Sequence, residues 1–270
     1  MDTRRADVCP VLCRTGIPVP QTEERVSFGG KDMSKKIYAL VIALISILSA
    51  SQVAQSPVLR QSAYSVHDAY ALALGNPVKM YACGYGSQWN SFSYCYLAML
   101  ILAGVFVYSN CYAYPEGFRT LSILRFGSER SYWKHTMRRN GKYVAFASAV
   151  PLLCVFAANA IGTARHGLGT VQFVPYNSFP AVYVLLWVKL FAFLGMLIVF
   201  AEVFCQTISR AGIIGILVVV TVILFSIDLL QQQSALLAIG SWQQQLMAIF
   251  VFVVVQAGLL IYGTRRPLKI

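Results

Sequence analysis

The sequence of 270 residues has few charged side chains. Asp, Glu, Lys and Arg make up 12% of it, whereas 57% of its residues are hydrophobic. This balance is too apolar for an ordinary soluble domain of this size. Acidic residues are the scarcer kind, ten against 22 Lys and Arg, which gives a net charge of +12. The charge does not favour nucleic-acid binding, because it lies in clusters that flank apolar runs.

Motifs of known catalytic chemistry are missing. The chain has no GxxxxGK[ST] loop for nucleotide phosphates, no HExxH motif and no GxSxG elbow. Its apolar runs hold no paired acids of the kind that intramembrane proteases use. His67, His135 and His166 fall in three different predicted loops, so none is assigned as a metal ligand. These absences favour transport or binding over catalysis. We predict that the chain is not an enzyme and holds no metal or cofactor of its own.

None of the seven cysteines forms a CxxC pair. Cys9 and Cys13 have no second half of a zinc site, so a zinc site there is not expected. Cys83 and Cys95 fall in a segment that the charge distribution places outside the cell, where a disulfide between them is chemically allowed. The cysteines within apolar runs, which we expect to be small buried residues, are Cys111, Cys154 and Cys205.

Six apolar runs are long enough to cross a bilayer. The predicted spans are about 37–54, 92–113, 143–161, 182–208, 211–230 and 246–263. The fold class is therefore an all-α polytopic membrane protein with six transmembrane helices. A short surface helix is also predicted near residues 67–74, in the loop after the first span. Residues 231–245 are predicted to form an uncharged outer loop.

The N-terminal segment, residues 1–36, is polar and has no periodic pattern, so we expect it to be disordered. Met33 directly precedes the first apolar run and is a plausible true start. The run itself also fits a signal peptide, since Lys35 and Lys36 precede it and small residues follow near Ala50. A retained helix with a cytoplasmic N-terminus fits the rest of the chain better.

The positions of Lys and Arg predict the orientation of the spans. Seven of these residues lie before the first span, seven in residues 119–142, one (Arg210) in the turn after the fourth span and three at the C-terminus. The other loops hold only three. Because basic residues accumulate on the cytoplasmic side, we predict that both termini are cytoplasmic and that the protein lies in a bacterial cell membrane.

Three ionisable residues fall within predicted spans: Lys189, Glu202 and Asp228. Each would cost about 2.5–3.5 kcal/mol at mid-bilayer, so each needs a physical explanation. Glu202 could reach water near the cytoplasmic end of its span, and Lys189 could extend its ammonium towards the outer interface. The alternative is a contact between Lys189 and Asp228. The tight turn between the fourth and fifth spans would place them antiparallel, with both charges at similar depth.

Residues 119–142, RTLSILRFGSERSYWKHTMRRNGK, form the most basic segment of the chain. Ser128 is a candidate N-cap, with Glu129 in the first turn of the helix that follows. Arg130, Lys134 and Arg138 then recur every four residues, beside an apolar stripe of Trp133 and Met137. The pattern predicts a short amphipathic helix at the membrane surface between the second and third spans.

The stretch Leu121–Asn140 resembles the loop of ABC-2-type ABC transporter permeases, in particular small Gram-positive permeases linked to bacteriocin or lantibiotic export and immunity. Their pattern I-L-x-R-x-G-S-R-x-x-W is similar to ILRFGSERSYW in this chain. The resemblance covers about twenty residues and the layout of the spans, and the polar N-terminus departs from it. It implies a coupling helix that docks on a separate ATP-binding subunit. The residues implied in docking are Arg125, Phe126, Ser128, Arg130, Trp133 and Lys134.

The expected function is that of the permease subunit of an ABC transporter, which moves an amphipathic peptide or lipid-like compound with ATP hydrolysed, with Mg²⁺, on the partner chain. The expected partners are this cytosolic subunit, a second permease chain (identical or related) and membrane lipids, but not nucleic acid. Three alternatives stay open. The basic residues could bind anionic lipids, the chain could be a membrane sensor or immunity protein that binds an extracellular peptide, or it could be a membrane enzyme of another type.

Overall fold

A computed structural model describes residues 22–55, 66–74, 91–111, 129–166, 179–204, 207–230 and 236–265, some of them by their backbone alone. The regular structure in these ranges is entirely α-helical and includes no strand. Six of the helices are long and apolar enough to cross a membrane. This confirms the predicted all-helical fold with six candidate spans.

The chain forms two compact units, Met1–Ile37 and Tyr38–Ile270. The first unit contributes the beginning of α1 (Thr22–Gln55), and the second contains the rest of α1 and all the other helices. The helix starts well before residue 37, so the expectation that residues 1–36 have no regular structure is wrong for residues 22–36. Residues 1–21 lie outside the described part of the chain.

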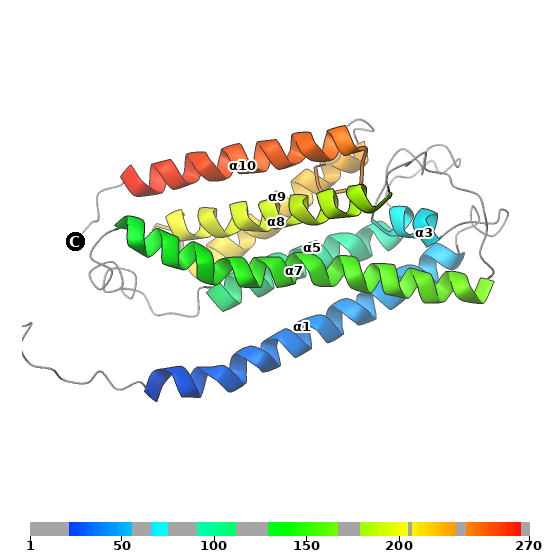
Figure 1. Ribbon diagram of the computed structural model, residues 1–270, viewed down its shortest axis with the longest axis horizontal. Coiled ribbons are helices and arrows are strands. Elements are labelled where there is room, and N and C mark those ends of the chain that lie inside the picture. Colours follow the sequence, from blue (N-terminus) through cyan, green and yellow to red (C-terminus); the bar gives the residue numbers. More distant parts are fainter. Residues whose placement is uncertain are drawn as a thin grey trace, which may run out of the picture. The chain divides into compact units, whose positions relative to one another are not determined.

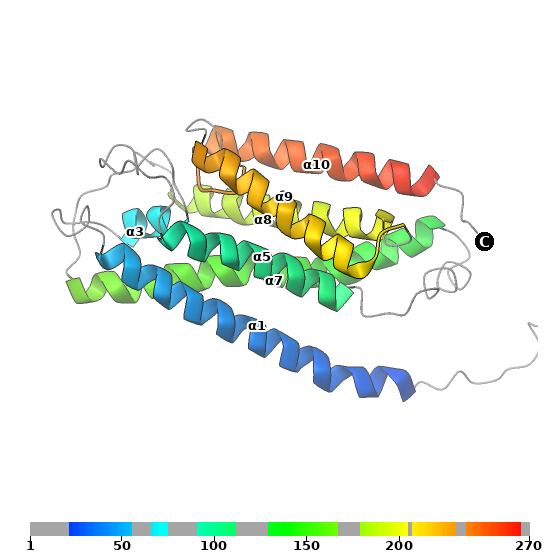
Figure 2. The same cartoon turned by 180° about the vertical axis from the view of Figure 1, so that it is seen from behind.

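Six long helices alternate in direction through the second unit (Figures 1 and 2). After α1 they are α5 (Ser91–Cys111), α7 (Glu129–His166), α8 (Phe179–Phe204), α9 (Arg210–Leu230) and α10 (Trp242–Arg265). We call the end where α5 and α8 finish and α7 begins the basic end. The opposite end contains the short helix α3 (Val66–Ala73), close to the predicted position.

The amphipathic helix predicted between the second and third spans and the third span itself are one helix in the structure. α7 runs without interruption from Glu129 to His166 and contains Pro151. Gly141 lies where the amphipathic helix was expected to end and the third span to begin. A helix tolerates a glycine at a cost of about 1 kcal/mol. The segment that we expected to lie on the membrane surface is therefore the first part of a helix that is long and apolar enough to cross a membrane.

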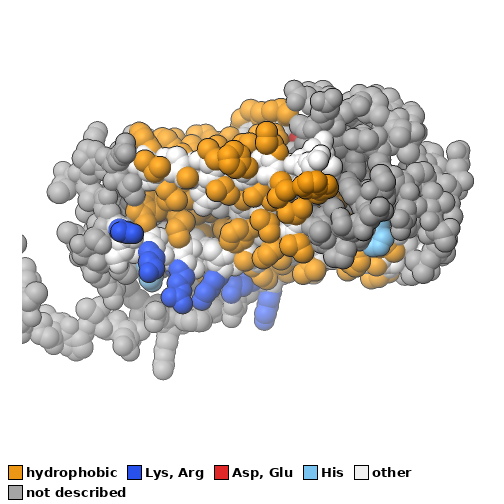
Figure 3. Space-filling model, turned by 45° about the horizontal axis from the view of Figure 1, so that its top comes forward, with side chains coloured by type: hydrophobic (Ala, Val, Ile, Leu, Met, Phe, Trp, Pro, Cys, Tyr) orange, Lys and Arg blue, Asp and Glu red, His pale blue; other side chains and the backbone are white. Residues whose placement is uncertain are grey.

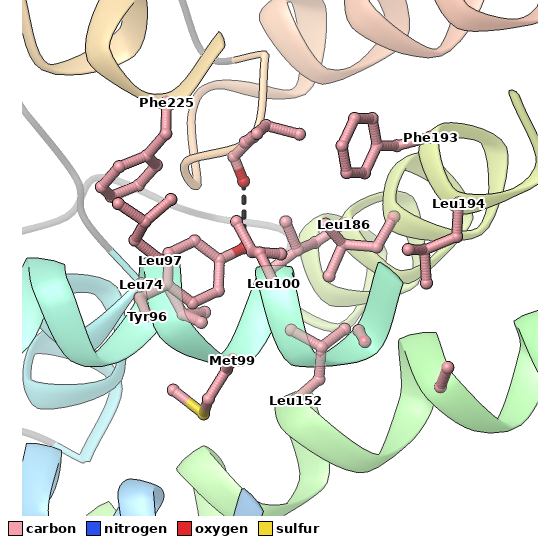
Figure 4. Packing of buried hydrophobic residues seen from close by; sticks show 14 of the residues in the cluster. Leu74, Tyr96, Leu97, Met99, Leu100, Leu152, Leu186, Phe193, Leu194 and Phe225 are labelled. Carbon is pink, nitrogen blue, oxygen red and sulfur yellow. Dashed lines mark hydrogen bonds between the residues drawn. The ribbon is translucent and has the colours of Figure 1, made fainter. Parts of the chain in front are cut away.

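The core of the second unit surrounds α8, which packs against α5, α7, α9 and α10. Figure 4 shows Tyr96 and Leu100 of α5 on the side of Leu186 of α8, whereas Met99 points the other way, where its sulfur lies 3.5 Å from Ser46 Oγ of α1. Ordinary side-chain packing joins the helices here, as at Gly104, where an added Cβ would lie 3.8 Å from Leu197 Cδ1. Because lipid tails are as apolar as these residues, close packing stabilises the bundle more than water exclusion does.

Polar side chains inside the spans are mostly satisfied by their own helices. Ser46 and Thr221 each donate a hydroxyl hydrogen bond to the carbonyl oxygen four residues earlier, at 2.8 and 2.7 Å. Asn159 does the same through its amide at 2.8 Å. This local pairing removes the cost of an unpaired polar group in hydrocarbon. These residues therefore need no functional explanation.

The outward surface of the spans is apolar, as Figure 3 shows for one face. α10 has its inner side on α8 and exposes Phe250, Val254 and Ile261 on the other. α1 and α9 likewise expose large aliphatic side chains such as Leu44 and Ile223. Such a surface fits lipid or another apolar helix, not water.

Candidate functional site

The first turns of α7 pack against the ends of α8 and α10 at the basic end. Tyr132 and Trp133 are 8% and 6% exposed and form a cluster with Val199 and Val203 of α8. On α10, a Cβ added to Gly263 would lie 2.9 Å from Val203 Cγ2 and 3.3 Å from Trp133 Cζ2. Glycine at this position therefore allows the three helix ends to meet closely.

A buried hydrogen bond fixes the same turns of α7 to α8. The Tyr132 hydroxyl donates to Glu202 Oε1 at 2.5 Å, and Glu202 is only 4% exposed. About two turns further along α7, Arg139 Nη2 donates to the carbonyl oxygen of Cys111 at 3.4 Å. Cys111 is the last residue of α5, where an arginine suits the negative end of the helix dipole. Glu202 is buried, so the expectation that its carboxylate reaches water is wrong.

The residues implied in docking divide into three groups. Arg130 and Lys134 are exposed, as docking requires. Trp133 is buried in the bundle, so it is not available for the docking role that the resemblance implies. The apolar stripe of α7 covers α8 and α10 of the same chain. The implied residues that lie outside the described part of the chain are Arg125, Phe126 and Ser128.

At the opposite end, Asp228 near the end of α9 binds the backbone of the segment that follows. Its carboxylate accepts hydrogen bonds from the backbone N–H groups of Leu236 at 2.6 Å, Leu237 at 2.5 Å and Ala238 at 2.8 Å. Asp228 itself is 0% exposed. A buried carboxylate loses its hydrogen bonds to water. Here three backbone N–H donors replace them, so the charge is compensated locally.

Lys189 reaches the same segment from α8. Its ammonium Nζ donates to the carbonyl oxygen of Ala238 at 2.5 Å, and the residue is 0% exposed. Lys189 and Asp228 thus converge on one residue and interact electrostatically. Lys189 does not extend to the surface, so the prediction that its ammonium reaches the outer interface is wrong. Tyr96 of α5 completes the set by donating its hydroxyl to the Leu237 carbonyl oxygen at 3.0 Å (Figure 4).

Residues 237–240 are buried, although the sequence predicted an outer loop here. The backbone N–H of Ile239 lies 3.4 Å from the carbonyl oxygen of Leu74, just after α3. Gln245 Nε2 donates to the Gly240 carbonyl oxygen at 3.1 Å, while its buried Oε1 has no hydrogen-bond partner among the described residues. α10 accordingly begins at Trp242, before the predicted position.

α3 attaches to the bundle through Tyr70. Its hydroxyl donates to the Leu152 carbonyl oxygen of α7 at 3.2 Å, and its ring lies edge-on to Tyr183 of α8 with ring centroids 4.8 Å apart. Burial raises the pKa of the Tyr70 phenol above its ordinary value. The predicted surface helix is therefore a packed element whose apolar residues are buried.

The Cys95 thiol is free and buried, with Sγ 3.7 Å from Gln52 Oε1 of α1. The sequence allowed a disulfide between Cys95 and Cys83, and it stays a prediction because Cys83 lies outside the described part of the chain. Across the described ranges, no three His, Cys, Asp or Glu side chains gather as metal ligands would. The groups that gather instead are Lys189 and Asp228 on the backbone of Ala238, and Tyr132 on Glu202.

Sequence reasoning missed Tyr96, Tyr132 and Gln245. Tyr96 lies in an apolar run, Tyr132 in a basic one and Gln245 in a predicted uncharged loop, where a tyrosine or glutamine is unremarkable. The partners of the two tyrosines are far along the chain, at Leu237 and Glu202. No family model, no curated protein and no solved structure matches this chain.

Proposed function

We propose that this chain is the transmembrane subunit of an ABC transporter of the ABC-2 type. A separate ATP-binding protein docks at the basic end, and its ATP hydrolysis moves an amphipathic peptide or lipid-like compound. The observation that carries the proposal is the first part of α7, which exposes cations while Tyr132 and Trp133 attach it to α8. A force applied to this part of α7 would therefore act directly on α8, the helix that the core surrounds. The resemblance of Leu121–Asn140 to ABC-2 permeases supports the same function.

The distribution of charge supports a cytoplasmic basic end. Among the side chains that the structure describes in the second unit, the exposed Lys and Arg lie at this end, on α7 and at Arg210 of α9. At the opposite end, Lys189 is buried and the helix α7 carries Arg165 near its last residue. Because basic residues are retained on the cytoplasmic side, both termini would be cytoplasmic in a bacterial cell membrane.

A second permease chain, identical or related, would complete the pathway. The exposed apolar side of α10 is available to lipid or to such a chain, and few described side chains could hold a hydrated solute. An amphipathic substrate fits this surface better than a small polar one.

The test is purification of the tagged full chain from native membranes in mild detergent, after chemical crosslinking of the membranes. We expect an ATP-binding protein in a fixed ratio to the chain, together with ATP hydrolysis that follows both proteins through size-exclusion chromatography. An unrelated tagged six-span protein from the same membranes is the control. If no ATP-binding protein is enriched over the control, the proposal fails and a membrane sensor or immunity protein becomes the better hypothesis.

The orientation is tested separately by labelling with a membrane-impermeant maleimide. Single cysteines are introduced at Ser131 at the basic end and at Ser234 after α9, in a background whose accessible native cysteines are replaced by serine. We expect intact cells to label Ser234→Cys and only permeabilised cells to label Ser131→Cys. Labelling of Ser131→Cys in intact cells would reverse the orientation.

A further inference from the structure

One side of α10 carries a heptad pattern of the kind found where two helices pair. Residues spaced alternately by three and four follow one line along a helix and meet the same line on a partner. On α10 this line, which we call the heptad face, consists of Leu246, Ile249, Val253, Gln256 and Leu260. All five are half-buried or exposed. α8 is the main neighbour of α10, and no described helix lies beyond α10 in Figures 1 and 2.

Gln256 is the one polar member of the heptad face. Its amide rests on α8, where a Cβ added to Gly195 would lie 3.5 Å from Gln256 Nε2 and 3.6 Å from Gln256 Oε1. Gly195 and Gln256 are both half-buried, so the amide lies at the edge of the contact between α8 and α10. Gln256 makes no hydrogen bond within the described part of the chain. The polar atoms of its amide are therefore open to a partner from outside.

The depth of Gln256 makes an unpaired amide unfavourable. Along the helix axis it lies about 21 Å from Trp242 and about 14 Å from Arg265, the two ends of α10. A glutamine side chain is about as long as one helical turn, about 5 Å, so it cannot reach water beyond either end. Lipid tails offer no hydrogen bond to the amide. A partner that supplies both a donor and an acceptor at this depth would remove the penalty.

We propose that the heptad face binds the heptad face of a second copy of this chain, with the two Gln256 amides hydrogen-bonded to each other. Two copies in one membrane share their orientation, so a two-fold axis along the membrane normal sets their α10 helices parallel. In a parallel pair each position faces its own counterpart. A primary amide is complementary to itself, because it has N–H donors and a carbonyl acceptor.

The apolar members of the heptad face contribute close packing, which lipid tails partly replace, whereas the amide pair has no equivalent in lipid. Gln256 therefore sets the register of the pair, as a single polar residue does in a coiled coil. As the second chain of a permease, this copy rests on the proposed function. The pairing itself follows from α10 alone.

The first test is disulfide crosslinking of the full chain in native membranes, in a background whose accessible native cysteines are replaced by serine. Val253→Cys introduces a thiol on the heptad face. Val251→Cys is the matched control, because Val251 is 40% exposed against 49% for Val253 but lies on the opposite side of the helix. With copper phenanthroline as the oxidant, we expect Val253→Cys to form a product of twice the chain's mass of 29.8 kDa. Val251→Cys should stay monomeric.

Coexpression of two differently tagged chains identifies both halves of the crosslinked product. Recovery of both tags in one product supports a second copy of this chain. A link from Val253→Cys to a different protein, or equal links from the two variants, would overturn the inference. Absence of any link from Val253→Cys would do the same.

The second test measures the dissociation constant of the pair in mild detergent by energy transfer between labelled chains. Gln256→Leu keeps the size of the side chain and removes the amide, so we expect the constant to rise about five- to thirtyfold. Gln256→Asn keeps an amide and should weaken the pair less. Gln243→Leu, an exposed position off the heptad face, is the control and should stay within about twofold of the wild type. Melting temperatures check that every variant folds. An unchanged constant in Gln256→Leu would contradict the amide pair.

Failure of this inference and failure of the proposed function give different results. If an ATP-binding protein co-purifies in a fixed ratio but Val253→Cys forms no dimer, the permease function stands and α10 is not the contact. If the Val253→Cys dimer forms and depends on Gln256 but no ATP-binding protein co-purifies, the pair stands and the permease function fails.

Discussion

Lys189 and Asp228 bind the backbone of the same residue from two helices. Asp228 Oδ2 accepts the Ala238 N–H at 2.8 Å, and Lys189 Nζ donates to the Ala238 carbonyl oxygen at 2.5 Å. The two charges therefore fix a non-helical segment, residues 236–240, between the end of α9 and the start of α10. Non-helical backbone is tolerated at such a position only where protein satisfies its polar groups, and these side chains do so.

Removing either charge of this pair should destabilise the protein strongly. Lys189→Met or Asp228→Asn leaves the other charge buried without its partner, at a cost of about 3–5 kcal/mol. We expect each variant to unfold at least about 6 °C below the wild type in mild detergent. A thiol-reactive dye measures this, because unfolding exposes the buried Cys95 and Cys111.

The double variant Lys189→Met/Asp228→Asn separates charge pairing from simple damage. If the charges stabilise each other, its loss should be smaller than the sum of the single losses by about 1 kcal/mol or more. Lys134→Met is the control for removal of a lysine, and at this exposed position the change should stay within about 0.5 kcal/mol. Fully additive losses would show that the two residues act independently.

The Tyr132–Glu202 hydrogen bond should hold the first turns of α7 on α8. Tyr132→Phe removes a hydrogen bond to a buried carboxyl group, a contribution of about 1.5–3 kcal/mol if that group is ionised. We expect hydrogen exchange of residues 130–140 to accelerate by about tenfold or more, with little change in α5 and the middle of α8. Peptide-level mass spectrometry measures the rates.

Arg138→Gln, on the exposed side of the same turns, is the control and should leave these rates unchanged. Glu202→Gln should accelerate the same peptides, and adding it to Tyr132→Phe should have little further effect because both changes remove one bond. Unchanged exchange in Tyr132→Phe would mean that apolar packing of Trp133 alone fixes α7.

Tyr70 gives a pH-dependent contribution with a defined sign. Its pKa is raised in the folded state, so the folded protein retains the phenolic proton after the unfolded chain has lost it. The stabilisation is complete below the ordinary tyrosine pKa of about 10 and declines as the pH rises above it. The hydrogen bond to Leu152 contributes about 1 kcal/mol. A rise of one pH unit above the ordinary tyrosine pKa lowers the stability by slightly more than this, and so cancels the contribution.

We therefore compare the melting temperatures of the wild type and Tyr70→Phe across alkaline pH. The wild type should be more stable by about 2–4 °C at neutral pH, and the difference should vanish near about pH 11. Taking the difference removes the contribution of the other tyrosines. A difference that stays constant from neutral pH to about pH 11 would contradict the role assigned to Tyr70.

The number and order of the spans follow from the sequence because apolar length is a local property. The burial of residues 237–240 does not, because it depends on Lys189 and Tyr96, which are distant in the chain. The alternation of cations with Trp133 correctly predicted two faces in the first part of α7. A pattern cannot say whether the apolar face meets another protein or the same chain, and here it meets Val203 and Gly263.

The approach of α7, α8 and α10 at Gly263 gives the last prediction. A Cβ at this position would lie 2.9 Å from Val203 Cγ2 and 3.3 Å from Trp133 Cζ2, so a neighbouring side chain must move. Such overpacking costs about 1–3 kcal/mol. Gly258 lies on the same helix, and an added Cβ there meets nothing within 4 Å.

Gly263→Ala and Gly258→Ala therefore form a matched pair. Both gain about 1 kcal/mol of helix propensity, so the difference between their melting temperatures isolates the steric effect. We expect Gly258→Ala to melt at or above the wild type and Gly263→Ala to melt about 2–10 °C below Gly258→Ala. Hydrogen exchange should also accelerate in residues 130–140 of Gly263→Ala, because the displaced Trp133 carries the first turns of α7. Equal melting of the two variants would show that α10 does not pack on Trp133 in the protein.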